Sequence, residues 1–222
     1  MRTYIFIWKV SPLNVPRALV HMAIDRISLK ANARITFFKS LGTGAGKTFT
    51  PSDADPLTWA LLITTDLSEV QVKELPAIRA WRKFALSESY FELESTSSHG
   101  QWAGQEPFGN VRSERWDGEV ATITRARIAW RENPIFWRSV PPVTTSLLST
   151  PGLISAMGIG EAPIGLQGTF SHWSSSSALR AFAYEGEAHK RAIELTSERK
   201  WYKEELFARF AVIKQELKTL KN

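Results

Sequence analysis

The sequence predicts an α+β fold built from two ferredoxin-like halves, each with the element order βαββαβ. Three observations support this prediction. Strand-type segments alternate with helical segments, the same order of elements occurs twice along the 222 residues, and a glycine-containing segment stands at the corresponding place in each series. We therefore expect tandem repeats that form an α/β barrel of the dimeric type within one chain, with halves at 1–110 and 111–222.

The first half is predicted from the spacing of its apolar residues. The expected elements are a strand at 3–10, a helix at 15–31, strands at 34–41 and 57–65, a helix at 69–86 and a strand at 90–95. The apolar stripe of the first helix consists of Val20, Ala23, Ile24 and Ile27. Since His21 falls near the polar side of that helix, we expect it to be exposed.

The second half repeats this order after a Gly/Pro-rich connector at 100–110. Its expected elements are a strand at 120–129, a proline-broken helical stretch at 134–148, strands near 153–158 and 164–173, a helix at 177–199 and a strand at 205–213. The segments LGTG (41–44) and MGIG (157–160) each follow the second strand of their half. Burial of the two bare sheet faces against each other gives the barrel, and the cavity between the sheets is the expected ligand site.

Composition excludes several classes of protein. The chain has no cysteine, which rules out disulfides, thiolate-bound haem, thiolate-held iron–sulfur clusters and cysteine-type zinc sites. Ser11 and Pro12 end the short apolar run of residues 1–10, and the sequence shows neither a signal peptide nor 18 unbroken apolar residues. We therefore expect a cytoplasmic protein.

The charge pattern is mildly basic. Lys and Arg number 28 against 22 Asp and Glu, a net charge of +6, and the surplus is concentrated in residues 112–138 and 200–221. Because the basic residues are mixed with Glu, a solvated face is the first interpretation, and an anionic ligand or a peripheral membrane contact is the alternative. We expect no nucleic-acid partner. Nine Trp and twelve Phe suit both a core and a pocket for a large apolar ligand.

Residues 42–48, GTGAGKT, resemble a phosphate-binding loop. The motif G-x-x-x-x-G-K-[ST] requires glycine at position 41, where this chain has Leu41, and it must open into a helix, whereas Pro51 and Pro56 follow. We therefore expect no nucleotide hydrolysis. The glycines are expected to permit a close-packed turn or the close approach of backbone to a ligand.

His189 is the histidine with the strongest case for a function. In the predicted helix 177–199, one face carries Phe182, Gly186, His189, Ile193 and Thr196. Gly186 lies one turn before His189 and has no side chain, which leaves room for a flat ligand beside the imidazole. The alternative is a core histidine that is hydrogen-bonded to a neighbouring carbonyl group.

The remaining histidines are weaker candidates. His99 falls in a Ser/Gly-rich loop and is expected to be solvated. His172 shares a strand face with Gly168 and Phe170, and period-two alternation leaves open whether that face lines the inter-sheet cavity or lies under the helices. No two histidines have the i, i+4 spacing of a helical metal pair.

Several segments carry a resemblance to a known family. They are GTGAG (42–46), FTP (49–51), GQWAG (100–104), FWRSVP (136–141), GIGEAP (158–163), QGTFSHW (167–173) and WYKEELFARF (201–210). Together they span most of the chain, and the last is the most specific. They resemble the spheroidene monooxygenase family, the carotenoid ketolases of purple photosynthetic bacteria.

The resemblance implies an oxygen-dependent enzyme that contains haem b and oxidises the end of an acyclic carotenoid, with electrons from a ferredoxin-type partner. The family's histidine in the final helix, preceded by a glycine, matches His189 and Gly186 here, so His189 is the implied iron ligand. Arg125 and Arg138 match family positions and are the implied partners of the haem propionates. A homo-oligomer is compatible with the sequence, and no catalytic residue is identified. A second hypothesis is a cofactor-free, ligand-binding or stress-related α/β-barrel protein.

Overall fold

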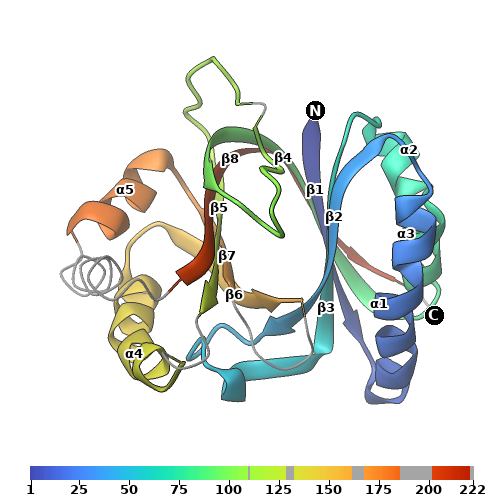
Figure 1. Cartoon of the computed structure of the whole chain (residues 1–222), viewed down its shortest axis with the longest axis horizontal. Helices are drawn as coiled ribbons and strands as arrows, with labels where there is room; N and C mark the ends of the chain where they lie inside the picture. Colours follow the sequence, from blue (N-terminus) through green and yellow to red (C-terminus); the bar gives the residue numbers. More distant parts are fainter. Residues whose placement is uncertain (110, 129–132, 162–167, 186–201, 221–222) are drawn as a thin grey trace.

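The computed structural model describes residues 1–109, 111–128, 133–161, 168–185 and 202–220 (Figure 1). The first half contains β1 (Arg2–Val10), α1 (Val15–Lys30), β2 (Ile35–Gly44), β3 (Ala54–Thr65), α2 (Glu69–Lys73), α3 (Pro76–Arg82) and β4 (Ala85–Gly100). The second half contains β5 (Val120–Ile128), α4 (Asn133–Ser149), β6 (Leu153–Gly160), β7 (Gly168–Trp173), α5 (Ser176–Glu185) and β8 (Tyr202–Thr219). The described elements therefore follow the same order in both halves.

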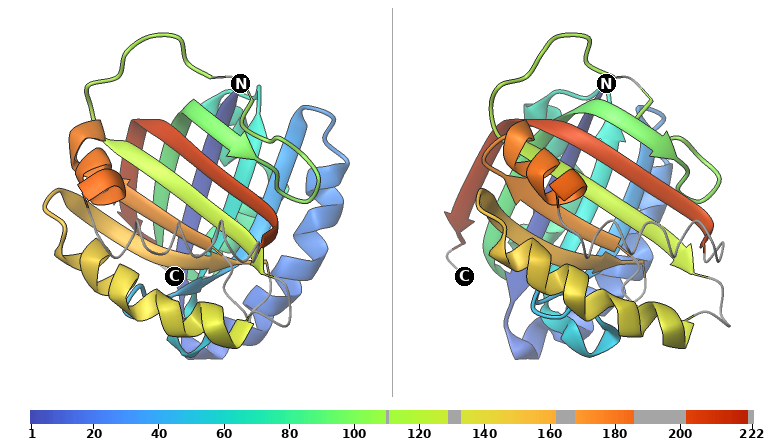
Figure 2. Two further views of the ribbon diagram at one scale, coloured as in Figure 1. Left: turned by 60° about the vertical axis from the view of Figure 1, so that its left-hand side comes forward. Right: turned by 90° about the vertical axis from the view of Figure 1, so that its left-hand side faces the viewer.

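The strands form one closed, antiparallel barrel in the order β1-β3-β2-β6-β7-β5-β8-β4. Within the first half the order is β4-β1-β3-β2, and within the second it is β8-β5-β7-β6. Helices α1, α2 and α3 lie on one side of the barrel, and α4 and α5 lie on the opposite side (Figure 1, Figure 2). The α+β class is confirmed. Within the described ranges, no helix has both the length and the apolar character needed to cross a membrane.

Two seams of different length join the halves. Strand β4 pairs with β8 from Ser87↔Thr219 to Gly100↔Leu206, whereas β2 pairs with β6 at Gly42↔Gly160, Thr43↔Ile159 and Gly44↔Gly158. The two glycine segments singled out in the sequence therefore pair with each other. Each is the end of its strand, not a segment that follows the strand, because the backbone ladder continues through it.

The end of β8 extends beyond the barrel onto the first half. Lys214 and Glu216 form ion pairs with Glu69 and Lys73 of α2, and the N–H of Leu220 donates to the carbonyl of Leu86 at 2.9 Å. Hydrogen bonds from three surrounding lysines lower the pKa of Glu216 to about 2. The last strand of the chain thus completes the packing of α2.

Apolar side chains fill the interior of the barrel. Buried residues from all eight strands meet there, and the connector after β4 adds Trp102 and Phe108. The interior of an eight-stranded barrel is just wide enough for side chains to fill. The expectation of a ligand cavity between the sheets is therefore wrong for the part of the chain that the structure describes, because the two inner faces bury each other.

Two helix predictions also need correction. The helix expected at 69–86 is two helices, because Pro76 has no N–H to donate and begins α3, and residues from Ala85 onward join β4. The stretch expected to be broken by proline is continuous, since α4 contains both Pro141 and Pro142.

The apolar stripe of α1 faces solvent. Val20, Ile24 and Ile27 are 54%, 47% and 71% exposed. His21, which we expected to be exposed, instead lies half-buried on the inner side, with its Nδ1 3.0 Å from Asp25 Oδ1. The expectation for His21 is wrong because the core under α1 contains a polar group: Asp25 is buried and accepts a hydrogen bond from Trp81 Nε1 at 2.8 Å.

Candidate functional site

The outer faces of the two half-sheets carry side chains of different size. Under α1 and α3, the first half has large buried side chains: Tyr4, Phe6, Trp8, Trp59, Leu61, Ile63 and Tyr90. By alternation with the interior residues, the matching face of the second half has mostly small ones on β5, β6 and β7: Val120, Thr122, Thr124, Ala156, Gly158, Thr169 and Ser171. Its larger side chains are Leu153, Trp173, Phe207 and Arg209. A flat group can therefore approach the backbone more closely on the second half, and we call this surface the second outer face.

Trp173 lies at one end of the second outer face, where it pairs with Val120 of β5 and Leu153 of β6. It is fully buried, and its Nε1 donates to Ser171 Oγ at 2.8 Å, while that oxygen lies 2.7 Å from Thr122 Oγ1. The ring of Phe182 from α5 packs against the indole, with ring centres 5.5 Å apart. Helix α5 thus turns the side that carries Phe182 toward the sheet.

The loop after β2 closes one edge of this face. Phe49 belongs to the same apolar cluster as Trp173, and Thr144 of α4 donates to the carbonyl of Thr48 at 3.1 Å. Gly46 has φ +72°, and a Cβ there would lie 2.3 Å from the carbonyl oxygen of Ala156. The close-packed turn expected of these glycines is confirmed at Gly46.

The backbone N–H groups of this loop already have an anionic partner. Asp53 Oδ2 accepts hydrogen bonds from the N–H groups of Lys47, Thr48 and Phe49 at 2.9, 3.1 and 3.2 Å. A phosphate would have to displace this buried carboxylate, and the loop leads through a single 3₁₀ turn, Pro51–Asp53, into β3 and not into an α-helix. The geometry agrees with the expectation that the loop is not a nucleotide site. The sequence did not single out Asp53, although an acidic residue after consecutive turn N–H groups is a usable signal.

Three of the four predicted cofactor residues cannot be placed from the structure. Gly186 and His189 lie outside the described residues, and of the helix expected at 177–199 the described part is α5. Arg138 belongs to α4, but its side chain also lies outside what the structure describes. Their assigned roles remain predictions.

Arg125, the fourth predicted residue, is buried near the end of β5, where two carboxylates hold it. Its Nη1 pairs with Glu204, and its Nη2 lies 3.2 Å from Glu161 Oε1. Glu161 also accepts a hydrogen bond from Trp102 Nε1 at 2.7 Å and pairs with Lys39 Nζ at 2.6 Å. Arg125 remains a predicted propionate partner, and in this structure its guanidinium faces carboxylates of the chain itself.

Both carboxylates of this cluster are held ionised. Burial raises the pKa of Glu204, but the N–H groups of Gly104 and Ala103 and the side chain of Arg125 outweigh it, so the pKa lies below its usual range. The pKa of Glu161 is also lowered: burial raises it, and the cations and the indole around the carboxylate lower it by more. The cluster fastens the connector to the second half. Sequence reasoning missed both glutamates because their partners come from distant segments.

His172 lies inside the barrel. It is 1% exposed, its ring is 5.4 Å from that of Phe91, and its Nε2 is 2.8 Å from Glu119 Oε2. Its Nδ1 is buried without a hydrogen-bond partner. The structure thereby decides which face His172 occupies, which the sequence left open. His99 is exposed as expected, but it lies in β4 and not in a loop.

The residues of the second outer face meet part of what a haem site requires. Haem needs an axial ligand, a flat space and cations near its propionates, and a chain without cysteine leaves histidine as the natural nitrogen ligand. Of the described histidines, His21 is bonded to Asp25, His99 is exposed and His172 is enclosed in the filled interior. In the described part of the chain, no group of three or more His, Asp and Glu side chains is placed to hold a metal ion. The small side chains beside Trp173 leave the flat space that a haem needs.

Comparison with known proteins decides the family. No protein-family model matches the chain. The chain is 31% identical over 206 residues to spheroidene monooxygenase of Rhodobacter capsulatus, an alignment that covers 90% of this chain and 85% of that protein. The chain belongs to the spheroidene monooxygenase family. A relative of the same name from Cereibacter sphaeroides is 31% identical over 200 residues, which cover 88% of this chain and 61% of the relative. Membership confirms the resemblance seen in the sequence and makes the chain an enzyme of the oxidoreductase class.

A solved structure shares the fold of this family member. An aldoxime dehydratase crystallised with butyraldoxime superposes with a TM-score of 0.59 at 10% sequence identity, and the match covers 97% of this chain and 81% of that protein. At this identity the likeness concerns the fold alone.

Proposed function

We propose that the chain is a haem-dependent monooxygenase that uses dioxygen to oxidise a large apolar, carotenoid-like substrate. The observation that carries the proposal is the 31% identity over 206 residues with a protein named spheroidene monooxygenase. The aromatic content of the chain, 11% of its residues, also suits a substrate of this kind.

The haem is proposed to lie on the second outer face and not inside the barrel. Phe182, which shares the predicted helical stripe with Gly186 and His189, packs against Trp173 of this face. A helix that continued the same spacing would direct the imidazole of His189 to the same side. On this proposal His189 is the iron ligand, and Gly186 leaves room for the macrocycle.

The propionates are proposed to bind arginine. Arg138 lies on α4, which covers the second outer face, whereas Arg125 alternates with the interior residues Ala121 and Ile123 and lies beside Trp102. Since Arg125 already pairs with Glu161 and Glu204, it would have to exchange one of them for a propionate. Such an exchange leaves the kind of ion pair made by Arg125 unchanged, because a propionate carboxylate replaces a glutamate carboxylate.

When bound, haem supplies the activation of dioxygen that lets one oxygen atom enter a substrate C–H bond, while two electrons and two protons reduce the other oxygen atom to water. We propose that a ferredoxin-type protein donates the electrons. The chain's own residues position and shield the reactants. A hydrogen bond from the second ring nitrogen of His189 would orient the imidazole, and Trp173, Phe182 and Leu147 would exclude water.

The two halves, 1–110 and 111–222, are also proposed to be tandem ferredoxin-like repeats. Their matching order of elements and of strands supports this. The antiparallel pairing of Gly42 with Gly160 and of Gly44 with Gly158 supports it further, since each segment meets its counterpart as it would across a twofold axis.

A haem titration tests the proposed function. Wild-type protein should bind one equivalent of haem with a Soret band, and His189→Ala should abolish or greatly weaken binding because the iron loses its axial ligand. His172→Ala is the matched control and should retain the band, since that imidazole is enclosed among side chains of the barrel interior. If His172→Ala lost haem binding while His189→Ala kept the wild-type spectrum, the assignment of His189 as the iron ligand would be wrong.

The second candidate function is a cofactor-free, ligand-binding or stress-related barrel. The observation that favours it is the open space of about 450 Å³ between α1 and β2, which lies away from the proposed haem face and could take a ligand without a cofactor, whereas side chains fill the barrel interior. Under this alternative His189 is a core residue. A wild-type protein that shows no Soret band after addition of haem would support it against the monooxygenase proposal.

A further inference from the structure

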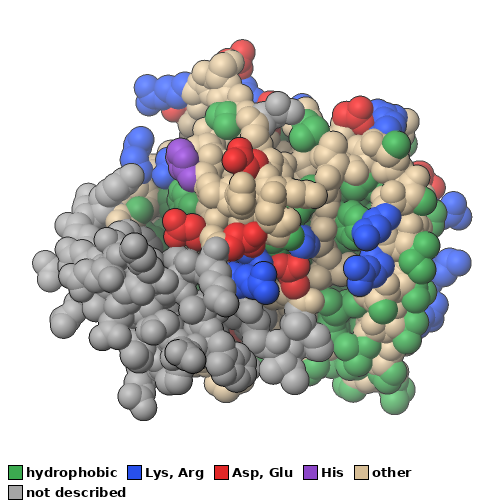
Figure 3. Space-filling view, viewed as in Figure 1, with side chains coloured by type: hydrophobic (Ala, Val, Ile, Leu, Met, Phe, Trp, Pro, Cys, Tyr) green, Lys and Arg blue, Asp and Glu red, His purple; other side chains and the backbone are tan. Residues whose placement is uncertain are grey.

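Helix α1 presents an apolar surface to solvent. We define the α1 stripe as Leu19, Val20, Ile24 and Ile27 of α1 together with Leu13 of the turn just before it, which are between 42% and 92% exposed. Hydrophobic side chains gather over α1 along the right-hand side of the molecule, with Lys and Arg beside them (Figure 3). Single exposed apolar residues need no explanation, but a contiguous group on the outward side of one helix marks an interaction surface.

Cations flank the α1 stripe on both sides. Arg17 lies on one side, and Arg26 and Lys30 lie on the other, and all three are exposed. The only carboxylate in residues 11–34 is Asp25, which is buried on the opposite side of the helix. The exposed surface of α1 is therefore apolar at its centre and positive at its edges.

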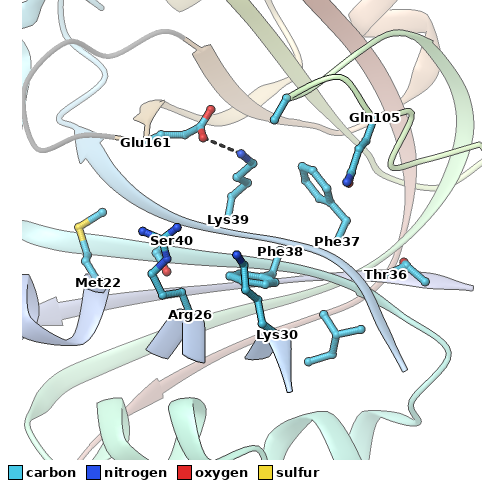
Figure 4. A pocket seen from close by; sticks show the side chains of 12 residues that line it. Met22, Arg26, Lys30, Thr36, Phe37, Phe38, Lys39, Ser40, Gln105 and Glu161 are labelled. Atoms are coloured by element: carbon cyan, nitrogen blue, oxygen red, sulfur yellow. Dashed lines mark hydrogen bonds and ion pairs between the residues drawn. The ribbon is translucent and has the colours of Figure 1, made fainter. Parts of the chain in front are cut away.

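Two of these cations also line an open cavity. Arg26 and Lys30 extend from α1 into a space of about 450 Å³ between this helix and β2, beside Phe37 and Phe38 (Figure 4). Lys39 on the far wall is paired with Glu161 at 2.6 Å, whereas Arg26 and Lys30 make no ion pair with any residue within the described ranges. Both side chains are thus available to an external anion.

We propose that α1 is an interfacial helix that docks the protein on an anionic lipid bilayer. The α1 stripe would enter the acyl region, while Arg17, Arg26 and Lys30 bind headgroup phosphates, as in amphipathic helices that lie in a membrane surface. The charge pattern favours this occupant over a second copy of the chain, because a twofold contact through α1 would bring the same cations of both copies together. The proposal goes beyond the proposed function and does not depend on haem.

Co-sedimentation with lipid vesicles tests the proposal. Wild-type protein should bind vesicles of phosphatidylcholine and phosphatidylglycerol. The double variant Ile24→Gln/Ile27→Gln should bind about tenfold more weakly, since two apolar side chains leave the acyl region. The matched control, Val111→Gln/Leu217→Gln, alters two exposed apolar residues outside α1 and should bind as wild type. Arg26→Gln and Lys30→Gln should each weaken binding about fivefold, and only on vesicles that contain phosphatidylglycerol.

Three results would overturn the proposal. They are the absence of wild-type binding to anionic vesicles, equal binding by the stripe variant and wild type, and a wild-type dimer in light scattering that the stripe variant converts to a monomer. Such a dimer would show that the α1 stripe binds a second copy of the chain and not a lipid bilayer. Since all these variants should bind haem like wild type, failure here is distinguishable from failure of the proposed function.

Discussion

Glu204 links three parts of the molecule through one carboxylate. It pairs with Arg125 of β5 and accepts hydrogen bonds from the N–H groups of Ala103 and Gly104 at 3.0 and 2.8 Å. A buried arginine that loses such a partner is left with an uncompensated charge. Here Glu161 would remain as a second partner, so the loss is softened.

We expect Glu204→Gln to lower the free energy of unfolding by about 2–3 kcal/mol at pH 7. Because the pKa of Glu204 is lowered in the folded protein, its stabilisation is present above the unfolded pKa of about 4.3 and is lost as the pH falls through the folded value. The difference between wild type and variant should therefore shrink below about pH 4. Urea denaturation across this range measures it, with Glu205→Gln, at an exposed neighbour, as the control. If the difference in unfolding free energy between wild type and Glu204→Gln did not change with pH, the lowered pKa assigned to Glu204 would be wrong.

Asp53 and Lys47 provide a test of the glycine-rich loop. Asp53→Ala should destabilise the protein by about 2–3 kcal/mol, because three backbone N–H groups lose a charged acceptor. Lys47→Ala should change stability by less than about 0.5 kcal/mol, as for an ordinary surface substitution, and neither the wild type nor either variant should bind ATP. Thermal unfolding and calorimetry measure both effects. Micromolar ATP binding that Lys47→Ala abolished would reverse the interpretation of this loop.

The sequence could predict the role of a residue where that role depends on neighbouring residues in the chain. The rejection of residues 42–48 as a phosphate-binding loop depended on neighbouring residues, and it agrees with the structure. Glu161 could not be identified, because its partners Lys39, Trp102 and Arg125 become neighbours when the barrel closes. The sequence also could not show which face of the sheet His172 occupies. Alternation separates the two faces of a strand, but only closure of the barrel determines which of them is the inner one.

At the scale of elements, a glycine at the end of β4 and another just after it offer a controlled comparison. Gly100 has φ +86°, and a Cβ there would lie 2.1 Å from the carbonyl oxygen of Glu205, whereas Gly104 has φ +71° with no atom within 4 Å of its Cβ position. Gly104→Ala should cost about 1 kcal/mol for the left-handed backbone alone. Gly100→Ala should cost about 2–4 kcal/mol, since the β4–β8 contact must also open. Chemical denaturation measures both, and equal losses would show that the close approach is unimportant.

Strands and helices were predicted well where the pattern alone determines them. The predicted strand 3–10 corresponds to Arg2–Val10, and the predicted helix 15–31 corresponds to Val15–Lys30. The orientation of that helix was wrong, because hydrophobicity predicts which residues avoid water and cannot distinguish a protein core from another apolar environment. The outward α1 stripe is the source of the membrane proposal.

At the scale of the whole molecule, the halves share one interior. Residues 1–110 alone would expose the inner face that carries Ile5, Phe37 and Leu62. We expect this fragment to self-associate or aggregate, and to form a one-to-one complex when refolded with residues 111–222, because each half buries the inner face of the other. Sedimentation velocity distinguishes these states. A monomeric 1–110 fragment that unfolds cooperatively would show that the halves are independent domains.

The pairing of β8 with β4 gives the order of synthesis a consequence for folding. A ribosome produces Glu69 of α2 145 residues before its partner Lys214 of β8, and Ser89 of β4 is likewise made long before its partner Leu217. Until then the nascent protein holds an unpaired strand edge and an unburied barrel face, both of which promote aggregation. The first half therefore remains incomplete until β8 has been synthesised, and the growing chain must be protected over that interval.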